Sequence, residues 1–512
     1  MKVTLRKFPY RYLPYEERLL MREAQALGRI VRPDDDGLQL IVGGDVEPVL
    51  SRLHRLTYFS HFSIGQGPAI PTQQFLLETT ANGSGTASRQ STRYSSHGLH
   101  EYKGKFHPQI ARYLMGHSGL TPQSFVLDPF AGSGTVLVEA VHFGCNAVGV
   151  EANPLAVLVA NSKLKLLTAE DRELKHFQRI VDEGIETLET RSNISVLAKE
   201  LELAAPELEY LQSWFPSVVL VQLLEFRCYC KKRLRTEWAR VADSVVSAIA
   251  RDVSQQDPAD LRIRRRKEPL NRAPVADLLR TTLKTLISRT ISARNLFGGR
   301  PAYATELSGD SRNLVDVLSG VKRTSVDAII TSPPYATALP YIDTSRLSLV
   351  LLGLCSASEL RTLEKAQIGN REISPSERKH VEQQIEEKLS AMPSQICLFI
   401  QGLLCKLKST DAGFRKLNTP ALLAQYFYDM RTVLKQTHAV LSRNGMAYWL
   451  VGPNRTELAG KWLEIDTPHW IAAIAARVGF STGVEELDAY QRFGLHQRNG
   501  IRREFLISMQ PG

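Results

Sequence analysis

The sequence predicts an α/β protein built on a mostly parallel sheet. Phe125–Asp128 is a short apolar strand that leads through a glycine-rich turn into a helix from Thr135 to Phe143. Asn146–Glu151 is the next strand, and this strand–helix–strand order is typical of parallel sheets. A further apolar strand, Val326–Thr331, shows that the alternation resumes much later in the chain.

Composition and periodicity divide the chain into seven parts. A Gly/Ser/Thr-rich stretch after residue 78 cannot bury much apolar surface and indicates a linker, and the patterns between 166 and 300 are helical. We expect a small N-terminal module (1–78), a flexible linker (79–98), the first part of an α/β core (99–165), a large helical insertion (166–300), the second part of the core (301–355), a second helical insertion (356–415) and the last strands of the core (416–512).

Bulk properties favour an intracellular protein with an anionic partner. The formal charge is +11, and a basic surface attracts polyphosphate whatever its sequence. Six cysteines show neither a C-x-x-C pair nor the spacing of a disulfide framework, so we expect no metal site. The first residues lack the apolar core of a signal peptide, and no apolar run is long enough to span a bilayer. We therefore expect a cytoplasmic protein.

The turn from Asp128 to Thr135 has the features of a ligand site. Gly132 and Gly134 let the backbone pass close to a ligand, and the helix that follows offers unpaired N–H donors. Open α/β sheets bind ligands at this edge, beyond the carboxyl ends of their strands. Neither a Walker lysine nor Gly-x-Gly-x-x-Gly spacing is present. A purely structural turn is the alternative interpretation.

Two acids are further candidate ligand contacts. Glu151, at the end of the second strand, is placed to accept hydrogen bonds from ribose hydroxyls. Asp310, in Ser308–Ser311, fits either an adenine contact or a helix cap. A solvated carboxylate is the alternative for Glu151.

The predicted strand Val326–Thr331 leads directly into a turn with the sequence Ser332-Pro333-Pro334-Tyr335. The two prolines remove two N–H donors and fix φ, so carbonyls and the Ser332 hydroxyl are free to accept hydrogen bonds from an amine. Tyr335 is suited to stack on a base rotated out of a duplex. A Pro-Pro turn that merely closes a loop is the alternative.

These two elements together resemble the amino-methyltransferases that use S-adenosylmethionine (SAM). The family pattern D-P-F-x-G-S-G-T matches Asp128–Thr135, and [S/D/N]-P-P-[Y/F/W] matches Ser332–Tyr335. The resemblance implies a Rossmann-like fold with a mixed seven-stranded sheet, and SAM as the cofactor. It implies catalytic roles for Ser332, Pro333, Pro334 and Tyr335, and cofactor contacts by Lys105, His107, Asp128, Pro129, Phe130, Ala131, Gly132, Ser133, Gly134, Thr135, Glu151 and Asp310.

The same resemblance indicates the target base. Serine at the first position of the second motif favours cytosine N4, so we expect a site-specific DNA methyltransferase of that specificity. The alternatives are an adenine N6 DNA enzyme, a tRNA or other RNA guanine-N2 enzyme, and a non-catalytic SAM- or DNA-binding subunit of a defence complex. No Pro-Cys dipeptide offers the nucleophile of cytosine-C5 chemistry.

DNA is the expected partner, with a restriction or defence-system protein as a further one. The predicted insertion between the two motifs is a candidate target-recognition region. It contains a basic run that is suited to phosphate contacts, formed by Arg262, Arg264, Arg265, Arg266 and Lys267. A solvated basic loop is the alternative.

Overall fold

The computed structural model describes most of the chain. The described residues are 1–34, 36–82, 91–102, 104–188, 192–260, 263–296, 302–321, 325–336, 341–371, 373–408, 413–458, 461–487 and 503–512. Among the helices of these residues, none combines the length and hydrophobicity needed to cross a membrane.

A seven-stranded mixed sheet forms the centre of the molecule, in the order β13-β14-β10-β9-β6-β7-β8. Neighbours from β10 to β8 pair in parallel, whereas β14 is antiparallel to both β10 and β13. The strands are β6 (Phe125–Asp128), β7 (Asn146–Glu151), β8 (Ala304–Ser308), β9 (Val326–Thr331), β10 (Leu441–Val451), β13 (Phe480–Leu487) and β14 (Glu504–Pro511). The predicted Rossmann-like fold class is confirmed.

The central strands β6 and β9 are apolar and almost wholly buried, as parallel strands covered on both faces require. Helices α4 (Pro108–His117) and α5 (Thr135–Phe143) cover one face, and α19 (Phe414–Val440) and α20 (Thr467–Val478) cover the other. Because β6 and β9 are neighbours, the turns that follow them meet at one edge of the sheet.

The N-terminal residues form a second sheet, with strand order β2-β3-β1-β4-β5 and antiparallel pairing throughout. Its apolar side chains belong to the same buried cluster as those of α4 and α5, so this sheet packs directly on the central fold. Its elements are β1 (Lys2–Lys7), α1 (Pro14–Leu27), β2 (Arg29–Asp34), β3 (Gly37–Ile41), α2 (Val46–His54), β4 (Phe59–Ile64), β5 (Ile70–Pro71) and α3 (Gln73–Asn82).

Residues 91–98 differ from the flexible linker that the composition predicts, while residues 83–90 of that stretch lie outside the described residues. Ser95–Gly98 form a short 3-10 helix, η1, and Tyr94 and His97 are buried. Both side chains hydrogen-bond to the Glu139 carboxylate of α5. These contacts hold the segment against the core.

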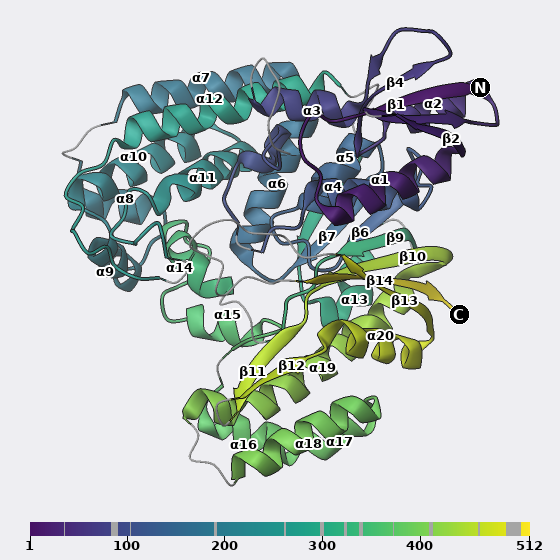
Figure 1. Cartoon of the computed structure of the whole chain (residues 1–512). Coiled ribbons are helices and arrows are strands. Elements are labelled where there is room, and N and C mark those ends of the chain that lie inside the picture. Colours follow the sequence, from purple (N-terminus) through teal and green to yellow (C-terminus); the bar gives the residue numbers. More distant parts are fainter. Residues whose placement is uncertain are drawn as a thin grey trace.

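A large helical insertion separates β7 from β8 and encloses its own apolar core. Figure 1 shows most of its helices as a blue-to-teal group at the left, away from the N-terminal sheet. They are α6 (Pro154–Thr168), α7 (Asp171–Glu186), α8 (Ile194–Glu200), α9 (Ala205–Trp214), α10 (Ser217–Arg233), α11 (Thr236–Ala250) and α12 (Val275–Arg294).

Short helices connect the remaining strands. After β8 come η2 (Ser311–Asn313), α13 (Leu314–Val317) and η3 (Leu318–Gly320); after β9 come α14 (Tyr341–Leu351), α15 (Leu360–Ala366), α16 (Pro375–Gln383), α17 (Ile385–Ser390) and α18 (Ser394–Lys408). A hairpin of β11 (Asn454–Leu458) and β12 (Lys461–Ile465) follows β10 and lies beside α19, close to α16–α18 in Figure 1.

Candidate active site

The glycine turn between β6 and α5 adopts a conformation that requires its glycines. Gly132 and Gly134 have φ values of +55° and +76°, in the left-handed region. A Cβ on Gly134 would lie 2.7 Å from that of Ala160, and one on Gly132 would lie 3.3 Å from the Tyr102 ring. The turn therefore packs closely against α6 and the segment that precedes α4.

Contacts to four other elements anchor the rest of the turn. The Pro129 carbonyl accepts a hydrogen bond from the Ser311 hydroxyl, and Phe130 packs edge-on against Trp449 of β10. The Ala131 N–H donates to the Val150 carbonyl, and the Ser133 carbonyl accepts a hydrogen bond from Lys163 Nζ at 2.6 Å. Thr135, the first residue of α5, is buried. The Ser133 hydroxyl is buried with no hydrogen-bond partner among the described residues, so it is available to a ligand.

Asp128 joins the two motifs. Its Oδ1 accepts the Phe130 N–H at 3.0 Å and the Thr331 hydroxyl at 2.5 Å. Burial raises the pKa of this carboxyl to about 7, although both hydrogen bonds lower it. The carboxyl end of β9 is therefore tied directly to the start of the glycine turn.

Glu151 holds the other side of the turn. Its Oε2 accepts the Gly132 N–H at 3.0 Å and its Oε1 accepts the Asn153 N–H at 2.8 Å. Burial raises the pKa of this carboxyl, and the backbone donors oppose that effect. A carboxylate fixed in this way has lone pairs left for hydroxyl donors of a ligand.

Asp310 caps a helix and forms an ion pair. Its Oδ1 accepts the Arg312 backbone N–H at 2.9 Å, and the Arg312 guanidinium lies 2.6 Å from its Oδ2. Arg312 also lies 3.3 Å from a carboxylate oxygen of Asp429 in α19. A cofactor contact by Asp310 would therefore share the carboxylate with this arginine.

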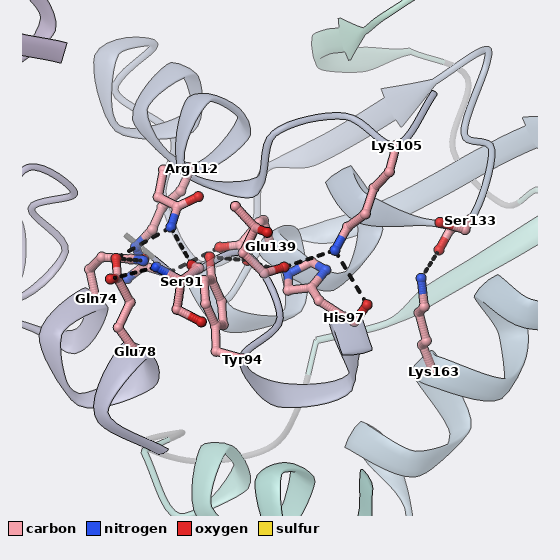
Figure 2. Close-up of polar contacts among 12 residues, drawn as sticks. Gln74, Glu78, Ser91, Tyr94, His97, Lys105, Arg112, Ser133, Glu139 and Lys163 are labelled. Atoms are coloured by element: carbon pink, nitrogen blue, oxygen red, sulfur yellow. Dashed lines mark hydrogen bonds and ion pairs between the residues drawn. The ribbon is translucent and has the colours of Figure 1, made fainter. Parts of the chain in front are cut away.

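Lys105 and His107 lie in the segment before α4. Figure 2 shows Lys105 directed toward backbone carbonyls: Nζ donates to Thr92 at 2.9 Å and to His97 at 3.3 Å. Burial lowers the pKa of Lys105 to about 8 and that of His107, the residue before α4, to about 4. Lys105 thus braces the segment that carries Tyr102.

The Ser332–Tyr335 turn is held on three sides. The Pro334 carbonyl accepts the Tyr426 hydroxyl at 2.9 Å, and the Tyr335 hydroxyl donates to Glu504 Oε1 at 3.1 Å. Gly369 approaches the Tyr335 carbonyl so closely that a Cβ there would lie 2.9 Å from it. Ser332, Pro334 and Tyr335 keep part of their surface exposed.

The basic run lies beside α14, the helix that follows the second motif. Arg262 lies outside the described residues, and the Ile263 N–H donates to Asp343 of α14 at 3.3 Å. Two of the remaining bases have side-chain partners: Arg264 pairs with Asp260, and Arg265 stacks over Trp214. Arg266 donates hydrogen bonds to the carbonyls of Asp252 and Ser254. Lys267 is exposed. Arg266 thus serves the fold of the loop.

Three side chains at this site were not singled out from the sequence: Tyr102, Thr331 and Glu306. Tyr102 lies three residues before Lys105, and Thr331 is the last residue of the predicted strand Val326–Thr331. Glu306 of β8 is buried, and neither of its carboxylate oxygens has a hydrogen-bond partner among the described residues. Its Oε2 lies 3.5 Å from the Cβ position of Gly134. The residues around Glu306 in the sequence do not indicate that its side chain lies beside the glycine turn.

Comparisons with known proteins agree with this geometry. Residues 99–184, which include the glycine turn, match the family model described as UPF0020, RMKL-like, methyltransferase domain. The chain is 23% identical to the type II methyltransferase M.AvaI of Nostoc over 80% of its own length and 86% of the relative's. We conclude that the chain itself is a SAM-dependent methyltransferase.

Other relatives match over shorter spans. Type II methyltransferase M.BsoBI of Geobacillus stearothermophilus is 25% identical over 54% of this chain and 56% of its own length. Type II methyltransferase M.MjaII of Methanocaldococcus jannaschii is 41% identical over 14% of this chain, and the match spans only 13% of that relative. These matches confirm the resemblance to DNA methyltransferases.

The glycine turn of this methyltransferase fits SAM. The two glycines hold the turn in a left-handed conformation, the Ser133 hydroxyl has no hydrogen-bond partner among the described residues, and Glu151 presents an oriented carboxylate. When bound, SAM would supply an electrophilic methyl group. Gly132, Ser133, Gly134 and Glu151 are the residues that would hold it.

A buried cluster of His97, Glu139 and His142 lies nearby, with ligand-type atoms within 4.8 Å of one another. The Glu139 carboxylate already accepts the Tyr94 hydroxyl at 2.8 Å and contacts His97 Nε2 at 2.7 Å. Arg112 lies 3.5 Å from its other oxygen, a position that repels a cation (Figure 2). We interpret the cluster as a structural network.

Proposed function

We propose that this methyltransferase acts on DNA and transfers the methyl group of SAM to an exocyclic amine of an extruded base, with cytosine N4 as the target. The hydrogen bond between Thr331 and Asp128 carries the proposal. It joins the end of β9, which leads into the Ser332–Tyr335 turn, to the start of the glycine turn, where we propose that SAM binds. The relatives named type II methyltransferases support DNA as the substrate and a restriction system as the setting. We propose the cytoplasm as the location.

In this proposal, catalysis depends mainly on how the protein orients the target amine. The Ser332 hydroxyl and the carbonyls of the proline turn accept the N–H groups of the target amine, which directs the nitrogen lone pair at the methyl group. Tyr335 stacks on the extruded base, and its bond to Glu504 fixes the ring. The amine nitrogen would gain the methyl group and release one proton to water, since Ser332, Pro334 and Tyr335 keep part of their surface exposed.

We assign target recognition to the helical insertion of residues 166–300, which lies between the two motifs in the chain. Its basic run is joined to α14 by the Ile263–Asp343 hydrogen bond, so cations lie beside the helix that follows the catalytic turn. Phosphate contacts there would fix the register of the duplex.

Nucleoside analysis by mass spectrometry tests the proposal. DNA and RNA would be taken from cells that express the intact protein and from cells that express the Ser332→Ala/Tyr335→Ala double variant. N4-methylcytosine in DNA that depends on both residues is the expected result. N6-methyladenine would preserve the mechanism and change the base, whereas methylated guanosine confined to RNA would overturn the proposal.

A further inference from the structure

The hairpin of β11 and β12 has two different faces. Residues alternate between the faces of a strand, and the cross-strand pairs are Arg455 with Glu464 and Glu457 with Trp462. Leu463 and Ile465 point inward and join the apolar cluster that contains α19. Arg455 and Trp462 lie on the outward face.

An arginine and a tryptophan form a stacked pair on that outward face. The Arg455 guanidinium carbon lies 4.4 Å from the centroid of the Trp462 ring, and 60% of Trp462 is exposed. Exposing so large an aromatic surface forgoes the free energy of burial. Tryptophan and arginine are also the residues most enriched at binding hot spots, and this pair is already ordered by its cation–π contact.

The charges of the hairpin favour a polyanionic partner. Each acid of the hairpin is ion-paired with a base outside it: Glu457 with Lys416 at 3.5 Å, and Glu464 with Arg503 at 2.8 Å. Arg455 and Lys461 have no ion pair within the described residues. Lys461 alternates to the face of Leu463, so Arg455 is the cation that lies beside the exposed ring. An arginine stacked on an aromatic ring matches the phosphates and bases of a nucleic acid.

The base of the hairpin is bonded to the catalytic turn. The Asn454 side-chain amide donates to the carbonyl of Ala336, the residue after Tyr335. Arg503, which pairs with Glu464, precedes the Glu504 that accepts the Tyr335 hydroxyl. A ligand that reaches Tyr335 is therefore brought to the start of the hairpin.

We propose that the β11–β12 hairpin lies in the major groove of the DNA beside the extruded base, with Trp462 and Arg455 against the duplex. A two-stranded ribbon fits that groove, which is about 12 Å wide. Trp462 is three residues from Ile465, so it lies about 10 Å along the strand from the hairpin base. At about 3.4 Å per base pair, its contact falls about three base pairs from the target. This inference rests on the proposed function.

Binding of the full-length protein to a duplex with its methylation site tests the hairpin. Trp462→Ala should weaken binding about 10-fold, the effect of losing one aromatic contact with a base. The matched control is Tyr303→Ala, since Tyr303 is 57% exposed and directly precedes β8. Arg455→Ala should lower the slope of log affinity against log salt by about one, whereas Arg32→Ala, at an exposed base on β2 of the N-terminal sheet, should not change it. SAM affinity should be unchanged in all four variants, which also shows that they fold.

A photo-crosslinking amino acid at position 462 gives an independent readout. The crosslinked base should lie about three base pairs from the methylated one. Unchanged affinity and salt slope in Trp462→Ala and Arg455→Ala, with wild-type DNA methylation intact, would overturn the role of the hairpin and leave the proposed function standing. Methylation of RNA and not of DNA by the wild-type protein would overturn the proposed function itself.

Discussion

The Thr331 hydroxyl donates a hydrogen bond of 2.5 Å to Asp128 Oδ1, although the two residues are 203 positions apart in the chain. Both side chains are buried, and they end the neighbouring strands β9 and β6. This bond sets the position of the catalytic turn relative to the cofactor turn. In the proposed mechanism, methyl transfer depends on this relative position.

We expect Thr331→Val to lower kcat and to destabilise the fold by about 1–3 kcal/mol, because the Asp128 carboxyl loses its buried donor. Thr331→Ser keeps the hydroxyl and should retain most of the activity. Single-turnover methylation and urea unfolding would measure both effects. Equal kcat for the valine and serine variants would show that the bond does not align the two turns.

The raised pKa of Asp128 predicts a pH-dependent stability. In the folded protein this carboxyl binds its proton up to about pH 7, whereas in the unfolded chain it releases the proton near its ordinary pKa of 3.8. The free energy of unfolding should therefore fall as pH rises between these values. Asp128→Asn removes this contribution, so its stability curve should be flatter in the same window. Urea unfolding at several pH values, without SAM, measures the difference, and parallel curves would contradict it.

Side chains added to the glycine turn should abolish SAM binding, whereas one added elsewhere should not. Gly134→Ala should lower stability and abolish SAM binding, because its φ is +76° and the new Cβ would lie 2.7 Å from that of Ala160. Gly132→Val should abolish SAM binding, since its branched side chain would reach into the space near Tyr102. Gly320→Ala is the control, because nothing lies within 4 Å of its Cβ position. Calorimetric titration with SAM measures each variant, and full affinity in Gly132→Val would exclude this turn as the cofactor site.

Tyr335 should contribute mainly through its ring. Tyr335→Ala is expected to abolish methylation while SAM affinity stays within about 2-fold, because stacking on the extruded base is lost. Tyr335→Phe keeps the ring and loses only the bond to Glu504, so it should retain a substantial fraction of kcat. Steady-state kinetics with a methylatable duplex separates the two variants. Full activity in Tyr335→Ala would refute the stacking role.

The basic run predicts two kinds of effect. Neutral residues at positions 264–267 should weaken DNA binding in a salt-dependent way, and the exposed Lys267 alone should lower the salt slope by about one. Arg266→Ala should instead lower thermal stability, because Arg266 donates to the carbonyls of Asp252 and Ser254. Fluorescence anisotropy at several salt concentrations measures binding. An unchanged slope after full neutralisation would reassign the run to a solvated loop.

The sequence was informative where neighbouring residues encode the structure. Phe125–Asp128 and Val326–Thr331 are apolar runs that end at turn residues, and such local patterns predict strands. Residues 91–98 show the limit of composition. Their burial depends on Glu139, which lies on another element, so a polar stretch that resembled a linker is held within the core.

The sequence by itself determined the fold class and the two motifs, because strand periodicity, glycine freedom and proline rigidity act within a few residues. Only the tertiary structure decided which distant side chains meet those motifs. Thr331 reaches Asp128 because β9 pairs with β6, and Glu306 lies near Gly134 because β8 pairs with β7. Strand order depends on how helices pack over both faces of the sheet, and no local preference of the chain encodes it.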